Sequence, residues 1–541
     1  MNQLFCGDNL EILQQYFPDE CVDLIYLDPP FKSNQNYNLL FEQKEDTRAK
    51  SQKLAFEDTW EWTKEAHEFV EEAINTPGKL ADAFVAFRAL LGPSDMLAYL
   101  AMMAPRLREL HRVLKRSGSL FLHCDPTASH YLKVLADAIF NGGNFRNEIV
   151  WKRSDAHNDS KQGAKHYGRV HDTLLFYTKS DDPYFRTLYR PLPQSTVDKW
   201  YRHVEEGTGR RYNKADVTGP GGAAKGNAFY DWKGNKRYWR YKREKMEALE
   251  AIGKLVYTKS GMVYEKRYLD ESKGVPIQDW WDDISMLRGI SGKKERVGYP
   301  TQKPRVLLER IIEAASEPGA IVLDAFCGCG TAIEAAQKLQ RQWIGIDCSD
   351  LAIKVVRERL KKNFPQGIER EYELIYEPRD LATAETLAVE DPFQFQQWAV
   401  RKLGGGEVRR GADKGVDGRL YFADDPTHKL KHILVSVKAG KRITPAFVRE
   451  LRGTLEREKG AMGILIAATE PTKSMKQEAV AAGTYRSLLG NFPKIQIITA
   501  AQLLDGAGYS IPPLMKIPLT KKNMASVALR QMNLPGISEG S

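Results

Sequence analysis

Short hydrophobic runs alternate with longer helical stretches in two parts of the chain. In the first part, "CVDLIYLDPP" and "SGSLFLHCD" flank "LAYLAMMAPRLRELHRVLK", whose apolar positions recur with helical spacing. In the second part, "GAIVLDAFCGCG" and "RQWIGIDCS" flank the helical stretch "TAIEAAQKLQ". Strands that alternate with helices are typical of a parallel sheet covered on both faces. The pattern therefore predicts a doubly wound, Rossmann-like α/β fold.

The chain between these two parts has a different pattern. It has little periodicity and mixes Arg and Lys with Tyr and Trp, as in "GRRYNKADVTGPGG" and "NKRYWRYKREK". A further strand-and-helix group follows the second part, and the end of the chain has no clear pattern. We therefore expect one α/β domain in two parts, residues 1–146 and 297–385, an insert at 147–296, a second α/β domain at 390–510 and a tail at 511–541.

Composition limits the class of protein. The 541 residues are 42% hydrophobic and 28% charged, which suits a soluble protein of two or three domains. No apolar run reaches the roughly 18 residues of a membrane span, and the start "MNQLFCGDNLEIL" lacks the pattern of a signal peptide. We expect a cytoplasmic protein without a membrane partner.

The net charge of +10 favours a polyanionic partner. The six scattered cysteines predict reduced thiols instead of a zinc site or a disulfide framework.

The second α/β part contains a candidate cofactor turn. Asp324 ends an apolar strand, and Gly328 and Gly330 lie in the turn before a helix, where backbone can approach a ligand closely. An ordinary strand–helix turn would explain the glycines alone. Ile333 stands where a dinucleotide fingerprint has its third glycine, and Asp347 ends the next strand, where an acid can bind both ribose hydroxyls. This arrangement suits S-adenosylmethionine, which is cationic and has no phosphate.

The first α/β part ends a buried strand with Asp28, Pro29, Pro30 and Phe31. The amino group of adenine is a poor nucleophile because its lone pair is delocalised into the ring. A carboxylate and a backbone carbonyl that accept its two N–H hydrogens would free that lone pair for attack on a methyl group. Proline fixes φ, so Asp28 and the Pro29 carbonyl can be aimed in advance, and Phe31 can stack on a base rotated out of the duplex. A simple proline turn explains the prolines but not the acid and the aromatic residue together.

The two motifs together resemble the DNA methylase N-4/N-6 family, with the catalytic motif before the cofactor motif as in its β class. The segments "GDNLEIL", "GSLFLHCDPTASHYLK", "NEIVWKR" and "YPTQKPRVLLERII" are similar to other segments of that family. The resemblance extends to about residue 381, except for much of the insert. It implies transfer of a methyl group from S-adenosylmethionine to adenine N6 in double-stranded DNA. Aspartate at the start of the tetrapeptide resembles adenine enzymes, whereas N4-cytosine enzymes usually have serine there.

The resemblance also assigns roles to particular residues. The catalytic residues would be those of the tetrapeptide, Asp28, Pro29, Pro30 and Phe31. The cofactor-binding residues would be Asp8, Thr301, Lys303, Asp324, Phe326, Gly328, Gly330, Thr331 and Asp347. The insert would be the target-recognition region, with Arg and Lys on phosphates and Tyr and Trp stacked on bases; a solvated basic face is the alternative.

The C-terminal α/β group resembles the Mrr-like branch of the PD-(D/E)xK restriction endonuclease fold, through "GADKGVDGRLYF" and "ILVSVKAG". That resemblance implies a nuclease site in which Asp417 binds Mg²⁺ and Lys438 acts on water. Ser436 departs from the pattern, because the family has Glu or Gln there and serine is a poor metal ligand. Glu407 and Asp413 are the nearest acids that could replace it. A domain that grips DNA without cleaving it is favoured over a live nuclease.

Three other functions remain open at this stage. The chain could methylate N4 of cytosine, or act as a bifunctional restriction–modification nuclease whose methylase part protects the host DNA. A catalytically idle DNA-binding protein is a third alternative, against which Asp28 and Asp324 argue. The target sequence, the biological role and the oligomeric state, with a homodimer as one alternative, are not determined by the sequence.

Overall fold

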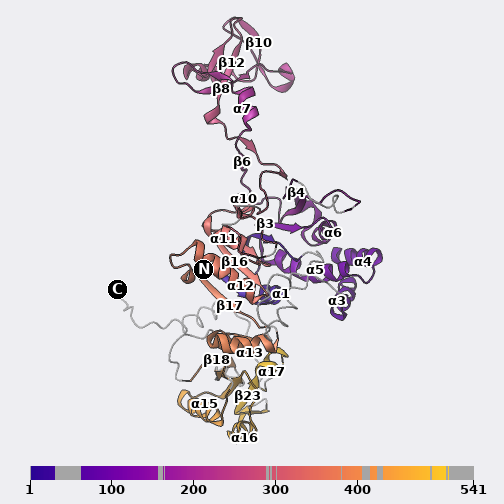
Figure 1. The fold of residues 1–541 in the computed structure, drawn as a ribbon, viewed down its shortest axis with the longest axis vertical. Coiled ribbons are helices and arrows are strands. Elements are labelled where there is room, and N and C mark those ends of the chain that lie inside the picture. The colour runs from indigo at the N-terminus through magenta and orange to yellow at the C-terminus, as the bar shows by residue number, and fades with distance from the viewer. Residues whose placement is uncertain are drawn as a thin grey trace, which may run out of the picture.

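The computed structural model consists of three bodies arranged along one axis: the insert, a central domain and a C-terminal module (Figure 1). It describes residues 2–30, 62–155, 163, 165–287, 292, 295–299, 301–378, 380–404, 415–422, 431–440, 442–487, 490–506 and 510. The three bodies are separate because each has a hydrophobic core of its own.

The central domain is built on a nine-stranded sheet. Its order is β14 (Trp280–Trp281), β4 (Phe145–Lys152), β5 (His171–Thr178), β3 (Leu114–Cys124), β2 (Val22–Leu27), β15 (Ile321–Asp324), β16 (Gln342–Asp347), β1 (Asn2–Cys6) and β17 (Tyr372–Tyr376). All neighbours pair in parallel except β5, which is antiparallel to β3 and β4. The predicted doubly wound α/β fold is confirmed, and the one reversed strand is an addition to it.

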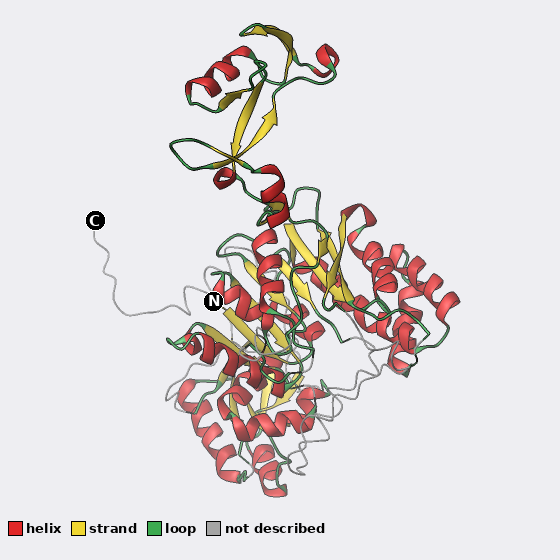
Figure 2. Cartoon of the chain, turned by 45° about the horizontal axis from the view of Figure 1, so that its top comes forward, coloured by secondary structure: helices red, strands yellow, loops and turns green. Residues whose placement is uncertain are grey.

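Helices cover both faces of this sheet (Figure 2). One face packs against α1 (Asn9–Tyr16), α3 (Lys64–Asn75), α4 (Lys79–Leu91), α5 (Asp95–Val113) and α6 (Ser129–Phe140). The other packs against α10 (Arg305–Ala315), α11 (Thr331–Lys338) and α12 (Asp350–Asn363). Because both faces are covered, the central strands are apolar on both sides, and Leu24 and Ile25 of β2 are fully buried in different clusters.

The insert is shorter than the predicted range 147–296. Most of β4 and all of β5 and β14 fall in that range, yet these strands pair within the central sheet. The separate body covers residues 189–276 and is joined to the central domain through the short pair β6–β13. Its elements are β6 (Tyr189–Arg190), α7 (Gln194–Trp200), β7 (His203–Val204), β8 (Arg211–Asp216), η4 (Gly222–Lys225), β9 (Ala228–Trp232), β10 (Asn235–Trp239), α8 (Arg243–Ala251), β11 (Leu255–Tyr257), β12 (Val263–Tyr268), η5 (Leu269–Glu271) and β13 (Val275–Pro276).

The C-terminal module is a second α/β domain, as predicted. Its sheet has the order β18–β19–β20–β23, in which only β18 is antiparallel to its neighbour. Its elements are α13 (Leu381–Glu390), α14 (Pro392–Lys402), β18 (Gly418–Phe422), β19 (Lys431–Lys438), α15 (Pro445–Glu458), β20 (Met462–Ala467), α16 (Lys473–Ala481), β21 (Thr484–Ser487), β22 (Gly490–Pro493), β23 (Ile495–Thr499) and α17 (Ala500–Leu504). The predicted tail, 511–541, lies outside the described residues. In the part of the chain that the structure describes, no helix has the length and apolar character needed to cross a membrane.

A buried ionic network fixes the helices beside the candidate cofactor turn. Glu334 of α11 is almost fully buried and accepts hydrogen bonds from Arg359 of α12 and, at 2.7 Å, from Arg305 of α10. The Arg359 guanidinium also donates to the Cys329 carbonyl at 3.2 Å and the Thr331 hydroxyl at 3.0 Å. One carboxylate therefore ties three helices to the turn.

Replacing Glu334 by Ala should lower the free energy of unfolding by about 3–5 kcal/mol, because the buried Arg359 loses its counter-charge. Urea titration followed by circular dichroism would measure this change. Glu358→Ala is the matched control. It removes an exposed acid next to Arg359 on α12 and should leave the unfolding midpoint unchanged. Equal midpoints for the two variants would contradict the structural role of the network.

Candidate active site

The ends of four neighbouring parallel strands bring the two predicted motifs together. Asp324 of β15 pairs in register with Tyr26 of β2, and Asp347 of β16 pairs with Cys6 of β1. Parallel strands place their carboxyl ends at one edge of the sheet, which is where open α/β sheets bind ligands. Asp28, Asp324, Asp347 and Asp8 therefore gather at one edge, although they come from distant parts of the chain.

Asp28 follows β2 directly and forms an ion pair with Lys303, whose Nζ lies 2.5 Å from Asp28 Oδ2. Lys303 is only 8% exposed and lies just before α10. The resemblance placed Lys303 with the cofactor, whereas the structure places its amine on the candidate catalytic carboxylate. Within the part of the chain that the structure describes, Asp28 Oδ1 makes no hydrogen bond. Pro29 is buried behind it, and Phe31 lies outside the described residues.

Asp324 and Asp347 are carboxylates held by backbone N–H groups. The Asp347 carboxylate accepts hydrogen bonds from Gly328 N at 2.8 Å and Ser349 N at 2.9 Å, and burial raises its pKa to about 6. Asp324 accepts from Phe326 N at 3.1 Å. Burial, together with the charges of Asp28 and Asp347, raises the pKa of Asp324 well above its ordinary value. A buried acid beside a partly buried one is complementary to a cationic ligand.

The turn between these acids needs its glycines. Gly328 has φ +48° and Gly330 has φ +73°, in the left-handed region that other residues rarely adopt. A Cβ atom on Gly330 would lie 2.9 Å from Val356 Cγ2, and one on Gly328 would lie 3.3 Å from Tyr299 Cε1. The glycines therefore allow both the turn and the close packing of α12 and Tyr299 against it.

The other predicted cofactor residues differ in exposure. Phe326 is partly buried beside Asp324, and Thr331 is buried at the start of α11, where it is bound by Arg359. Thr301 is exposed, with φ +59°. Their contacts with a cofactor stay predictions.

Asp8 connects α1 to the rest of the site. It caps α1 by accepting from Leu10 N at 2.8 Å and pairs with Arg106 of α5 at 2.6 Å. Arg106 also donates to Asn9 Oδ1 at 2.6 Å, and the Asn9 amide donates to the Ala325 carbonyl at 2.7 Å. The Asp8 segment is thus fixed against the cofactor turn, through an arginine that the sequence motifs did not identify.

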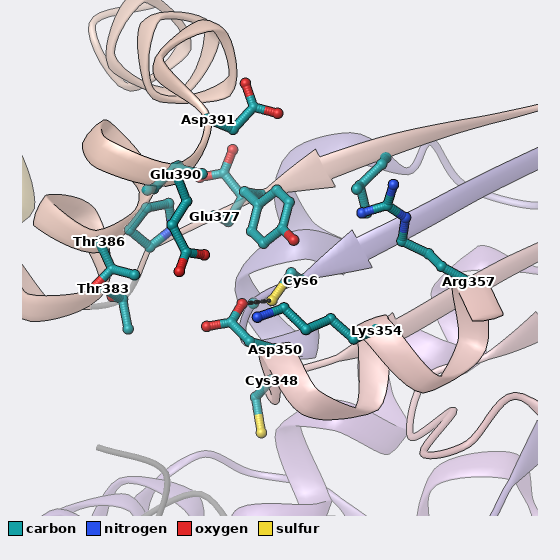
Figure 3. A pocket seen from close by; sticks show the side chains of 15 residues that line it. Cys6, Cys348, Asp350, Lys354, Arg357, Glu377, Thr383, Thr386, Glu390 and Asp391 are labelled. Carbon is teal, nitrogen blue, oxygen red and sulfur yellow. Dashed lines mark hydrogen bonds between the residues drawn. The ribbon is translucent and has the colours of Figure 1, made fainter. Parts of the chain in front are cut away.

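A cavity of about 180 Å³ lies where β1 and β17 end, lined by Cys6 of β1 and Tyr376 of β17 (Figure 3). Gly7 and Cys348, the neighbours of Asp8 and Asp347, also line it, and Cys6 donates from its thiol to Asp350 at 3.1 Å. Residues of α13, the first helix of the C-terminal module, close its other side: Thr383, Thr386, Leu387 and Glu390. The cavity therefore lies between the candidate cofactor residues and the fused module.

A buried polar chain lies beneath Asp28 and was also missed by sequence reasoning. The Tyr26 hydroxyl lies 3.0 Å from His123 Nδ1, and His123 Nε2 lies 3.3 Å from Asp172, which Arg153 approaches to 3.5 Å. Tyr26, His123 and Asp172 are all buried. A polar residue inside an otherwise apolar strand signals a buried partner, but the sequence does not show which one.

The predicted nuclease residues also come together, at the adjacent ends of β18 and β19. Asp417 Oδ2 accepts from Val437 N at 2.6 Å, and Asp417 Oδ1 accepts from the Gln396 side chain of α14. Ser436 is only 3% exposed, and Lys438 Nζ lies 4.7 Å from the centre of a phenylalanine ring on α15. Both oxygens of the Asp417 carboxylate are therefore engaged.

Metal ligands are few among the described residues of this module. No group of three or more His, Cys, Asp or Glu side chains placed to hold a metal occurs among the described residues. Glu407 and Asp413, the acids that the sequence offered as replacements, lie outside the described residues. Among the described residues, the donor set around Asp417 and Ser436 does not fit Mg²⁺, which needs several oxygen ligands.

The known proteins that this chain resembles include DNA methyltransferases. The chain is 31% identical over 271 residues to the type II methyltransferase M.EcaI of Enterobacter cloacae, covering 48% of this chain and 57% of that protein. It is 27% identical over 364 residues to the Mod subunit of the type III restriction-modification enzyme StyLTI of Salmonella typhimurium, covering 63% and 50%. The chain thus spans about half the length of these two relatives. For the DNA adenine methyltransferase YhdJ of Escherichia coli, the identity is 25% over 354 residues, covering 65% and 81%.

Two solved structures also match. The complex of M1.HpyAVI with SAM is 16% identical, covers 66% of this chain and 99% of that one, and gives a TM-score of 0.30. The cytosine-N4-specific PvuII DNA methyltransferase is 14% identical, covers 66% and 86%, and gives a TM-score of 0.34.

Sequence models of two families match different parts of the chain. Residues 393–505 match the family of NACHT-associated inactive Restriction Endonuclease 1, which confirms the predicted similarity to a restriction endonuclease domain. Residues 22–358 match the N6/N4 DNA methylase family. Since this second match covers more than half of the chain, the protein belongs to the N6/N4 family of DNA methylases.

Proposed function

We propose that this protein transfers a methyl group from S-adenosylmethionine to the N6 amino group of adenine in double-stranded DNA. The observation that carries the proposal is the position of Asp28, fixed by Lys303 at the same sheet edge as Asp324 and Asp347. Membership of the methylase family and the similarity to a DNA adenine methyltransferase support it. An aspartate instead of a serine at position 28 favours adenine over cytosine.

The residues at this edge fit S-adenosylmethionine. Asp347 offers carboxylate oxygens for ribose hydroxyls, Asp324 offers a buried negative charge for the amino group, and the turn at Gly328 allows close approach. The bound cofactor supplies an electrophilic methyl group on a sulfonium. No part of that role needs a metal ion from the protein.

Asp28 and the Pro29 carbonyl would act on the target base. Asp28 Oδ1 and the carbonyl oxygen accept the two N6 hydrogens, which frees the nitrogen lone pair, while Lys303 holds Asp28 Oδ2. As the new N–C bond forms and the C–S bond breaks, the nitrogen becomes positively charged and must lose a proton. The Asp28 carboxylate would accept that proton and pass it to solvent.

For the C-terminal module, we propose DNA binding without cleavage. Asp417 is bound by Gln396 and by a backbone N–H, and Ser436 replaces an expected ligand. A cavity of about 730 Å³ beside them is lined by Lys438 and Arg442, which could bind a backbone phosphate of DNA. The match to an inactive endonuclease family also supports this interpretation.

Replacing Asp28 by Ala should lower the rate of methyl transfer at least about a hundredfold, the scale for one lost preorganised group.

Lys303→Gln should lower kcat about tenfold to a hundredfold, because the carboxylate of Asp28 loses its orientation. Neither variant should weaken S-adenosylmethionine more than about twofold by calorimetry, if Lys303 acts through Asp28. If Lys303→Gln instead binds the cofactor more weakly and keeps a normal kcat, Lys303 is a cofactor-binding residue. Asp182→Ala, an exposed acid, is the control.

Nucleoside analysis of the methylated DNA from the same experiment identifies the base. N6-methyladenine is the expected product. N4-methylcytosine would contradict the choice of adenine while leaving the methylase assignment intact.

Cofactor affinity should fall as the pH falls through about 6. Ribose hydroxyls need an ionised acceptor, and the raised pKa of Asp347 places its protonation at about pH 6. The stability of the free protein should change in the opposite direction, because the folded state binds this proton more tightly than the unfolded chain. That stabilisation is complete below the ordinary pKa of about 3.8 and is lost as the pH rises through 6.

Calorimetry between pH 5 and 8 would measure the affinity, and thermal unfolding over the same range would measure the stability. Asp347→Asn should remove most of the pH dependence of both the affinity and the stability. Any pH dependence that remains would come from Asp324. An affinity that does not depend on pH in the wild-type protein would overturn the ribose assignment.

Wild-type protein should not cleave unmethylated DNA in Mg²⁺ or Mn²⁺. Lys438→Ala with Arg442→Ala should weaken DNA binding and lower the slope of log affinity against log salt by about 0.9 for each phosphate that is no longer neutralised. Lys473→Ala, an exposed lysine on α16, is the control. Metal-dependent cleavage that disappears in Lys438→Ala would show that the module is a live nuclease.

A further inference from the structure

Several cations on or beside one sheet of the insert are paired with acids of the same body. Arg210 lies 2.7 Å from Asp270, and Lys266 lies 2.7 Å from Glu205. Lys254 likewise pairs with Glu271 at 2.6 Å. These pairs hold β8, β12 and their loops together, so this part of the basic surface has a structural role.

The hairpin β9–β10 and its flanking turns have a different charge pattern. Residues 222–245 contain eight Lys and Arg but only two acids. Lys225, Lys236 and Lys242 are exposed, and none of them forms an ion pair within the part of the chain that the structure describes. These cations outnumber the nearby acids, which include Asp231 opposite Lys236 and Glu250 beside Lys233, so they repel one another, and a polyanion would relieve that repulsion.

The same hairpin exposes a pair of aromatic rings on its outer face. Phe229 is 54% exposed and Tyr238 is 37% exposed, and they are cross-strand partners with ring centres 4.8 Å apart. The inner face of the hairpin instead buries Trp232 and Trp239 in the core of the insert, with residues of α8. The outer pair therefore is not needed to fill the core.

The turn before the hairpin packs against this aromatic pair. Gly222 has φ +57°, and a Cβ atom there would lie 3.3 Å from Tyr238 Cε2. Gly219 N donates to the Tyr238 carbonyl at 2.8 Å. Glycine at these positions keeps the turn that carries Lys225 close to the exposed ring.

We propose that the outer face of the β9–β10 hairpin, with the η4 turn, is the surface of the insert that contacts double-stranded DNA. Phe229 and Tyr238 would enter the major groove, which admits a two-stranded ribbon, and Lys225, Lys236 and Lys242 would bind the flanking phosphates. This inference rests on the proposed function, because it takes DNA as the substrate. A protein partner fits less well, since protein interfaces are depleted of lysine.

The position of the hairpin predicts which kinetic step it affects. Figure 1 shows β10 at the end of the insert that lies away from the central sheet. The hairpin would therefore bind the duplex away from the base that enters the site at Asp28. It should contribute to DNA affinity and choice of site, and not to the chemical step.

Two variants test this surface: Phe229→Ala with Tyr238→Ala, and Lys225→Ala with Lys236→Ala and Lys242→Ala. Each should raise the Kd for duplex DNA, measured by fluorescence anisotropy, at least about tenfold, while kcat at saturating DNA stays within about twofold of wild type. The triple lysine variant should also lower the salt slope by about 2.7, or 0.9 for each phosphate. Trp200→Ala, which removes a 52% exposed aromatic residue from α7, should change neither value.

Circular dichroism and calorimetric binding of S-adenosylmethionine would confirm that each variant is folded. If the wild-type protein methylates DNA but the hairpin variants bind it with unchanged affinity and salt slope, the inference is wrong and the proposed function stands. If the wild-type protein does not methylate DNA at all, the proposed function fails first. Unchanged DNA binding with loss of self-association in ultracentrifugation would make the hairpin a contact between two copies of the chain, and would also overturn the inference.

Discussion

The parallel pairing of β2 with β15 is the constraint on which the site depends. These strands lie about three hundred residues apart, yet Leu323 pairs with Ile25 and Asp324 with Tyr26. A slip of one residue would turn Asp324 to the other face of the sheet, because side chains alternate along a strand. Because both faces are buried, the register is held by the fit of each side chain of β2 and β15 into the cluster on its own face, and a slip would disrupt that packing on both faces. Packing of the central core thus sets the distance between the candidate catalytic acid and the candidate cofactor acid.

Electrostatics then determine what this edge of the sheet can hold. Asp324 is buried near Asp28 and Asp347 is partly buried, and desolvation alone would favour the neutral form of both acids. Backbone N–H groups of the turn and Lys303 offset part of that cost, but both pKa values remain raised. A ligand with a cationic amino group and a sulfonium would offset more of it. The site is therefore better suited to S-adenosylmethionine than to a phosphate-bearing nucleotide, in agreement with the missing third glycine at Ile333.

The sequence was sufficient for the features that are local. The alternation of strands and helices predicted the α/β fold, and the proline corner and glycine turn predicted where the candidate site lies. Features that depend on long-range contacts were missed: the pair between Lys303 and Asp28, the chain from Tyr26 to Asp172, and the reversed strand β5. Each of these joins segments whose separation in sequence carries no signal of contact. The range 147–296 predicted for the insert is too wide for the same reason, because β4 and β14 pair only in the folded sheet.

The C-terminal module has a core that does not depend on the residues at its candidate nuclease site. Its core is formed by apolar residues of β19 and β20, such as Ile433 and Ile464, which do not depend on the residues at the strand ends. A serine at position 436 removes a charge from a buried position, and removing a buried charge that lacks a metal stabilises a domain. The fold is therefore compatible with the serine at this position. Because α13 also closes the cavity at the ends of β1 and β17, the module contributes to the surroundings of the candidate cofactor site whether or not it binds DNA.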